Sequence, residues 1–224
     1  MPALGDERVI RLALDINIFV ADILSRRRGR RDTASMKIVD AVRDGACPAG
    51  AVQLITSLPI IENFANVLQR RLGYEASSAQ ERAWILEEYA RQGPMPSRPY
   101  LNIGAGYIPF ASETELKQSI ENYLKQENAD KLFHEMQDDR YVLETALAGR
   151  ADMLVTGDVD DFCRGPAIRL QRRDVVLFPF VGRTLVIATP RFTAYWLDQG
   201  IIPDSGFVAA HAEDFSPFVA EAGS

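Results

Sequence analysis

Short apolar runs alternate with longer amphipathic segments along most of this chain. The runs at 8–14, 52–56 and 153–155 have the length and aliphatic content of buried strands. The spacing of apolar residues elsewhere predicts helices over 16–24, 33–44, 58–72, 78–91, 113–126, 139–149 and 191–199, and further strands over 174–180 and 184–188. Because strands alternate with helices, the pattern predicts an α/β fold with a central, mainly parallel sheet covered by helices.

Capping residues mark several of the expected helix ends. Ser57 is a credible N-cap for the helix that follows it, and Gly45 and Gly73 are expected to end the helices that precede them. Pro190 suits the first turn of the last helix. For the helix over 78–91, the expected packing residues are Trp84, Ile85, Leu86 and Tyr89.

The length of the chain and its prolines and glycines favour one elaborated domain. With 224 residues the chain can bury a full core. We expect a single domain over 8–199, with an insertion around 93–137 where prolines and glycines interrupt the periodicity, and an extension over 200–224. No apolar run approaches the ~20 residues of a membrane helix, and the N-terminal stretch lacks the pattern of a signal peptide. These features predict a cytoplasmic protein without a membrane partner.

Composition directs the search for chemistry towards carboxylates. The chain has two cysteines, Cys47 and Cys163, without CxxC spacing, and two histidines, His134 and His211. A cysteine zinc cluster and a His-rich metal site are therefore excluded. The net charge of −6 repels nucleic acid at long range unless positive charge is concentrated locally.

Four acidic residues stand where a parallel sheet forms its ligand site. Asp15 and Asp158 each follow a predicted strand, and the carboxyl ends of parallel strands share one edge of the sheet. Glu62 and Asp139 lie early in predicted helices beside such strand ends, so they can point into the same space. For any single acid a capping or turn role is roughly as common, so the joint pattern carries the argument. Converging carboxylates repel one another without a cation, and all-oxygen ligation suits Mg²⁺ or Mn²⁺, as one ion or two.

Three stretches of the sequence resemble the signature regions of the PIN-domain family. They are LALDIN (12–17), SLPIIENFANVLQRRLG (57–73) and DDRYVLETALAGRADMLVTGDVDDF (138–162). The third is the most specific, because an Asp, a helix with Ala-Leu-Ala, a hydrophobic strand and Thr-Gly-Asp follow one another in it. VIATPRFTAYWL (186–197) is similar to the closing strand and helix of one branch of the family, so the resemblance covers most of 8–197.

The resemblance implies a three-layer α/β/α fold and RNA cleavage that depends on Mg²⁺ or Mn²⁺. Asp15, Glu62, Asp139 and Asp158 match the four family acids in order, as catalytic residues and metal ligands. The further positions that the resemblance implies are Asn17 and Thr156 as orienting polar residues, Asp138 as an alternative ligand, and Asp160 or Asp161 as an additional carboxylate.

Many bacterial members of this family are similar to the toxins of toxin–antitoxin pairs. The resemblance therefore implies an antitoxin protein and a second copy of the chain as partners besides RNA. The long segment around 93–137 and the extension over 200–224 depart from a compact toxin.

A run of arginines follows the first expected helix. Its positive charge can contact RNA phosphates without reading the base sequence, and the alternative is a solvated loop or a dimer contact. The run comprises Arg26, Arg27, Arg28, Arg30 and Arg31.

Two other functions fit parts of the pattern. A catalytically silent PIN-fold module would bind RNA or act as a scaffold, although the retention of all four acids argues against it. An aspartate-based phosphatase also places an Asp at a strand end, but Asp15-Ile16-Asn17 lacks the second Asp of that nucleophile motif. No GxGxxG sequence follows the first strand, which disfavours a dinucleotide-dependent oxidoreductase.

Overall fold

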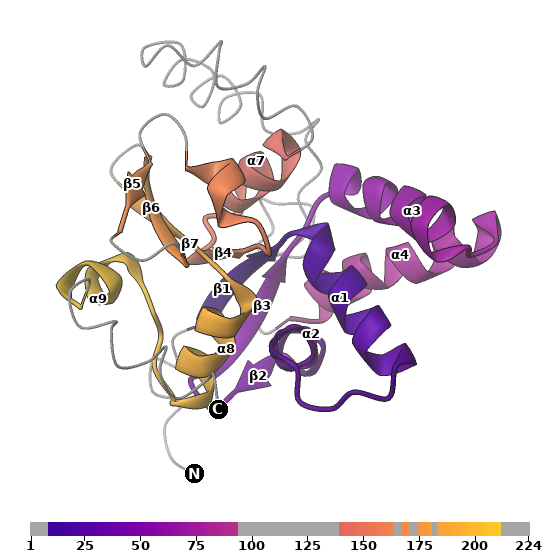
Figure 1. Cartoon of the computed structure of the whole chain (residues 1–224). Coiled ribbons are helices and arrows are strands. Elements are labelled where there is room, and N and C mark those ends of the chain that lie inside the picture. The colour runs from indigo at the N-terminus through magenta and orange to yellow at the C-terminus, as the bar shows by residue number, and fades with distance from the viewer. Residues whose placement is uncertain (1–8, 94–138, 164–166, 171–173, 181–182, 212–224) are drawn as a thin grey trace.

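The computed structural model describes residues 9–93, 139–163, 167–170, 174–180 and 183–211 (Figure 1). The helix expected over 113–126 lies outside the described residues. Within them the elements follow in this order: β1 (Val9–Leu14), α1 (Ile16–Arg27), α2 (Ala34–Asp44), β2 (Ala46–Cys47), β3 (Gly50–Ile55), α3 (Leu58–Leu72), α4 (Ala76–Gln92), α7 (Arg140–Ala148), β4 (Met153–Val155), the short 3-10 helix η2 (Val159–Phe162), β5 (Ile168–Arg169), β6 (Val175–Phe180), β7 (Arg183–Ala188), α8 (Pro190–Asp198) and α9 (Ser205–Ala210).

One mixed sheet runs through the molecule, with the strand order β2-β3-β1-β4-β7-β6-β5. The inner strands β3, β1, β4 and β7 are parallel, whereas β2, β6 and β5 run antiparallel to their neighbours. Ala13 of β1 pairs with Ile55 of β3 on one side and with Leu154 of β4 on the other. The carboxyl ends of β1, β3 and β4 therefore lie at one edge, which confirms the expected sheet architecture.

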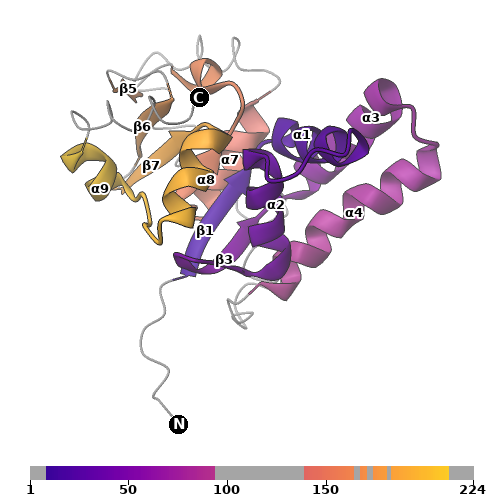
Figure 2. The ribbon, with the colours of Figure 1, turned by 60° about the horizontal axis from the view of Figure 1, so that its bottom comes forward.

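Helices cover both faces of the sheet (Figures 1 and 2). Along β1, Leu12 and Leu14 join a core shared with α1, α2, α3, α4 and α8, whereas Ala13 joins a second core with α7 and η2. Successive side chains of a strand point to opposite faces, so the neighbouring strands repeat this division. The result is the three-layer α/β/α fold that the resemblance implied. Beyond α8, the short helix α9 contacts β7 and buries Val208 in the first core.

Three of the four expected capping signals are confirmed. Gly45 and Gly73 both follow their helices in the left-handed conformation, with φ of 68° and 70°, which glycine adopts without a steric penalty. Thr189 caps α8 with its side chain, and Pro190 occupies the first turn as expected. Among the described residues, no helix combines the length and apolar character that crossing a membrane requires.

The packing face expected for α4 is wrong at two positions. Trp84 and Ile85 are 38% and 40% exposed. Besides Leu86, the residues that α4 buries are three alanines, Ala79, Ala83 and Ala90. Small side chains let α4 pack closely beside α3, and this closeness directs the larger neighbours outwards.

The side chain of Ser57 does not act as the expected cap. α3 begins directly after Ser57, but the hydroxyl makes no capping hydrogen bond. Its Oγ lies 2.7 Å from Oγ1 of Thr145 in α7. Because the Thr145 hydroxyl donates to the carbonyl of Tyr141, Ser57 is the donor to Thr145. Ser57 therefore joins the start of α3 to α7.

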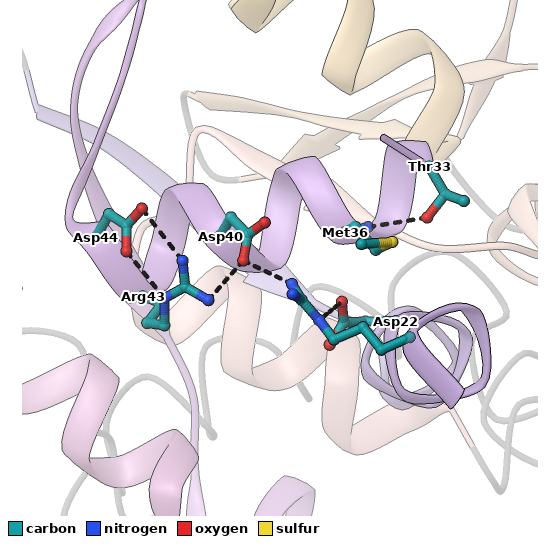
Figure 3. Close-up of polar contacts among 7 residues, drawn as sticks. Asp22, Thr33, Met36, Asp40, Arg43 and Asp44 are labelled. Atoms are coloured by element: carbon teal, nitrogen blue, oxygen red, sulfur yellow. Dashed lines mark hydrogen bonds and ion pairs between the residues drawn. The ribbon is translucent and has the colours of Figure 1, made fainter. Parts of the chain in front are cut away.

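A chain of ion pairs joins α1 to α2 (Figure 3). Arg26 Nε lies 2.7 Å from Asp22, and its Nη2 lies 2.6 Å from Asp40. Arg43 continues the chain with a 2.7 Å contact to Asp40. Asp22 is 7% exposed, and burial raises the pKa of its carboxyl although Arg26 opposes the shift. Arg26 is thus the main cation that compensates a buried negative charge.

Arg26→Gln leaves Asp22 buried without this cation. We expect the free energy of unfolding to fall by about 1–2 kcal/mol near neutral pH, less than for a fully buried pair because the guanidinium is accessible to water. The folded-state pKa of Asp22 should rise further in the variant. The loss of unfolding free energy is therefore small in acid, where the carboxyl is protonated in the folded and the unfolded protein, and it grows as the pH rises through the folded-state pKa of Asp22. Urea titrations at a series of pH values measure this dependence.

Arg43→Gln provides the matched control for this prediction. Its partners Asp40 and Asp44 are solvent-accessible, so the variant should lose less than about 1 kcal/mol, with little dependence on pH. Equal losses in the two variants would show that Arg26 does not compensate Asp22.

Candidate functional site

Asp15 and Thr156 lie side by side at the carboxyl edge of the sheet. Leu14 of β1 pairs with Val155 of β4, and each is the last residue of its strand. The pairing continues one residue further, because the Asp15 amide donates to the Val155 carbonyl at 2.9 Å. Asp15 and Thr156, the residues that follow the two strands, therefore lie next to each other although they are far apart in the sequence.

The Asp15 carboxylate is buried and held in place by two side chains. It is 7% exposed. Its Oδ2 accepts one hydrogen bond from Thr156 Oγ1 at 2.7 Å and another from Asn17 Nδ2 at 2.7 Å. Two donors on one oxygen fix the orientation of the carboxylate before any ligand binds.

The loop after β4 is fastened to the start of α1 by further hydrogen bonds. The Asp158 amide donates to Thr156 Oγ1 at 3.1 Å, and the Gly157 amide donates to Asn17 Oδ1 at 3.0 Å. A Cβ at Gly157 would lie 3.4 Å from the Asn17 side chain, so the two segments are in close contact. Asn17 and Thr156 were expected as orienting polar residues, and their geometry is consistent with that role. Gly157 was not among the expected residues, although it lies within the Thr-Gly-Asp motif.

Burial is the main cause of a raised pKa at Asp15. Hydrogen bonds from Thr156 and from the amides of Asn17 and Ile16 oppose this shift, and the negative charge of Asp161 adds to it. An ionised carboxylate here is therefore destabilised by poor solvation and by a like charge. A cation at this position would relieve both effects.

The other acids that follow β4 differ in their surroundings. Asp158 is exposed, and Asp161 is partly buried within η2. Asp160 is exposed and forms an ion pair with Arg169 of β5. The negative charge of Asp161 is the one of these three that contributes to the raised pKa of Asp15.

Glu62 and Asp139 lie on the neighbouring helices α3 and α7. Glu62 is exposed in the second turn of α3, and Asp139 is the partly buried residue directly before α7. Near these positions, the side-chain amide Nδ2 of Asn63 in α3 donates a hydrogen bond to the Tyr141 hydroxyl in α7. Asp138 lies outside the described residues.

The structure does not gather the four expected acids into one compact cluster. In the described part of the chain, no three side chains of Asp, Glu, His or Cys are close enough to hold one metal ion together. Their joint role as metal ligands therefore stays a prediction.

The arginine run divides into members with different contacts. Arg26 is held by Asp22 and Asp40, and the Arg27 guanidinium lies 4.6 Å from the centre of the Tyr74 ring. The remaining members are exposed in the loop between α1 and α2: Arg28, Arg30 and Arg31.

The comparisons with known proteins agree with this architecture. A family model of the PIN domain matches residues 11–160, a range that includes both strand ends of the site. The chain belongs to the PIN-domain family and has the nuclease-type fold of that family. No curated protein matches the sequence.

The donors at this edge suit a divalent cation. Asp15, Asp158 and Asp161 offer carboxylate oxygens, which Mg²⁺ and Mn²⁺ prefer. Mg²⁺ usually keeps several waters and takes only one or two carboxylates together with phosphate oxygens. Asp15 with one neighbouring acid meets that requirement.

Asp15→Asn should stabilise the folded chain at neutral pH. The variant keeps an oxygen that can accept from Thr156 and Asn17 but removes the poorly solvated charge. We expect a gain of about 1 kcal/mol, which corresponds to roughly 2–4 °C in Tm for a chain of this size. Because the pKa of Asp15 is raised in the folded state, the gain should shrink as pH falls and vanish below the ordinary value of 3.8, where both states are protonated.

Thermal unfolding followed by circular dichroism over a range of pH measures this difference. Asp158→Asn is the control, because Asp158 is exposed and its replacement should leave Tm nearly unchanged. A lower Tm for Asp15→Asn at neutral pH would refute the electrostatic account of the site.

Proposed function

We propose that this chain is a metal-dependent ribonuclease that hydrolyses phosphodiester bonds in RNA at the Asp15 site. The observation that carries the proposal is the buried Asp15 carboxylate, fixed by Thr156 and Asn17 at the edge where β1 and β4 end. A parallel sheet binds its ligands at this edge, and the PIN domain is a nuclease-type fold.

The side chains have separate roles in this proposal. Thr156 and Asn17 both donate side-chain hydrogen bonds to Oδ2 of Asp15, which orients this carboxylate as a metal ligand. Asp158 and Asp161, which follow β4, are the further ligands that we propose from the adjacent loop, and Glu62 and Asp139 are those that we propose from α3 and α7. A bound Mg²⁺ or Mn²⁺ would supply an activated water and would neutralise charge on the phosphate.

Replacing Asp15 should abolish RNA cleavage while the fold persists. Asp15→Asn should reduce cleavage by about a hundredfold or more, because a neutral amide binds a divalent cation far less well than a carboxylate. The assay follows a labelled RNA in the presence of Mg²⁺ or Mn²⁺, with circular dichroism as a check of folding. Asp44→Asn, which removes an exposed acid of α2, is the matched control and should retain full activity.

Three results would contradict the proposed activity. Cleavage by Asp15→Asn at the wild-type rate would place the chemistry elsewhere. Metal-independent binding of RNA without cleavage by the wild type would favour the catalytically silent module, and a phosphoryl group trapped on Asp15 would favour a phosphatase.

Metal binding should be visible in the stability of the protein without any substrate. Mn²⁺ or Mg²⁺ should raise the Tm of the wild type, because a ligand that binds only the folded state stabilises it. An excess of about 100-fold over the dissociation constant corresponds to about 2.7 kcal/mol. Asp15→Asn should lose most of this shift, and Asp44→Asn should keep it. An equal shift in all three proteins would refute the metal site at Asp15.

The toxin role is a finer part of the proposal. It derives from the resemblance to bacterial toxins, together with the antitoxin partner and the homodimer. A cytoplasmic location, which we expect from the features of the sequence described above, is also part of the proposal. A small DNA-binding protein encoded beside this chain would support the toxin role.

A further inference from the structure

Seven exposed arginines lie at the end of α1 and in the loop after it, at the end of α3 and in the second turn of α4. In the described part of the chain, none of them takes part in an ion pair, whereas Arg26, Arg43 and Arg91 do. We call them the arginine cluster, and they are Arg27, Arg28, Arg30, Arg31, Arg70, Arg71 and Arg82.

One tyrosine brings the members of the arginine cluster together. Arg27 of α1 lies 4.6 Å from the centre of the Tyr74 ring, and Arg82 of α4 lies 4.9 Å from it. Arg70 and Arg71 end α3 only a few residues before Tyr74. The contact between Arg27, the last residue of α1, and Tyr74 places the end of α1 beside the turn between α3 and α4.

The arginine cluster is positively charged although the whole chain is negatively charged. The segments 27–32 and 70–82 contain seven arginines and three acids, Asp32, Glu75 and Glu81, in a chain whose net charge is −6. Unpaired like charges held close together are unfavourable in isolation, so this arrangement suits a polyanionic ligand. Guanidinium groups bind phosphate oxygens in pairs and are weakly hydrated.

We infer that the arginine cluster is a second contact surface for the RNA strand, binding phosphates at a distance from the Asp15 site. The inference rests on the proposed function for the identity of the ligand. The 12 residues of α1 separate Asp15 from the arginine cluster by ~18 Å, so a strand that contacts both must be several nucleotides long.

A protein ligand is less suited to this surface. The turns that carry six of the seven arginines, 27–31 and 70–74, expose no large apolar side chain that could anchor a protein interface, and the exposed Trp84 and Ile85 lie further along α4, beyond Arg82. A phosphate backbone needs no such anchor, because its affinity derives from charge and counterion release.

Equilibrium binding to RNA tests the inference separately from catalysis. The Asp15→Asn protein, without added metal, is titrated against a fluorescent, unstructured single-stranded RNA at several salt concentrations, and anisotropy gives the dissociation constant. Each phosphate contact with a single strand contributes about 0.7 to the slope of log affinity against log salt. Replacing Arg28, Arg30 and Arg31 by Gln should weaken binding several-fold and reduce the slope by about 2, and replacing Arg70 and Arg71 should reduce it by about 1.4.

A control variant that loses the same number of positive charges elsewhere shows whether the position of the arginines matters or only the net charge of the protein. Arg150, Arg183 and Arg191 are exposed arginines outside the arginine cluster, and their triple replacement by Gln should leave the slope nearly unchanged. An RNA dinucleotide is too short to reach both surfaces, so its cleavage by otherwise wild-type protein should not respond to replacement of Arg28, Arg30 and Arg31. Circular dichroism verifies that each variant is folded.

Three outcomes would overturn the inference: no RNA binding by the Asp15→Asn protein, equal slopes for the cluster and control variants, or binding of polyglutamate in preference to RNA. Wild-type cleavage by Asp15→Asn would refute the catalytic assignment and leave the binding result standing. Normal cleavage of long RNA with unchanged salt slopes in the cluster variants would refute the arginine cluster alone.

Discussion

The hydrogen bond from Thr156 to Asp15 joins residues that are 141 positions apart in the sequence. It exists because β1 and β4 are parallel neighbours that end at the same level, and a shift of one residue in their register would put the two side chains on opposite faces of the sheet. The hydrogen bonds of Asn17, Gly157 and Asp158 all depend on this alignment. The pairing of two inner strands therefore determines the geometry of the whole site.

The same alignment places charge where it is poorly solvated. Asp15 is fixed by neutral donors rather than by an arginine or lysine, and Asp161 adds a like charge. Asp22 is buried to the same extent, but Arg26 compensates it directly. The contrast between the two buried aspartates distinguishes a carboxylate that stabilises helix packing from one that is suited to an external cation.

The parts of the fold that depend on local pattern were predictable from the sequence. Apolar runs identified the inner strands, and Gly45 and Gly73 identified helix ends because they occupy left-handed positions. The mainly parallel sheet followed from the alternation of strands and helices. The short helix α9 was missed because its six residues carry too weak a periodic signal.

Contacts between segments that are distant in the sequence explain why the other predictions differ from the structure. Ser57 could not be assigned a partner because Thr145 belongs to another helix, and the exposure of Trp84 depends on how closely α4 packs. Arg26 differs from its neighbours in the arginine run because Asp40 of α2 reaches it. At the candidate site, Asp15, Asn17 and Thr156 were identified from motifs, whereas the sequence could not predict the spacing of Glu62 and Asp139 from them.

The two guanidinium groups that contact the ring of Tyr74 limit what this part of the surface can distinguish. Arg27 and Arg82 both lie against its ring, so the aromatic surface on which a nucleobase would stack is already occupied. A strand held here would be recognised by its backbone and not by its bases. Any preference for a particular cleavage sequence would then have to arise close to Asp15, where the bases adjoining the scissile bond can be inspected.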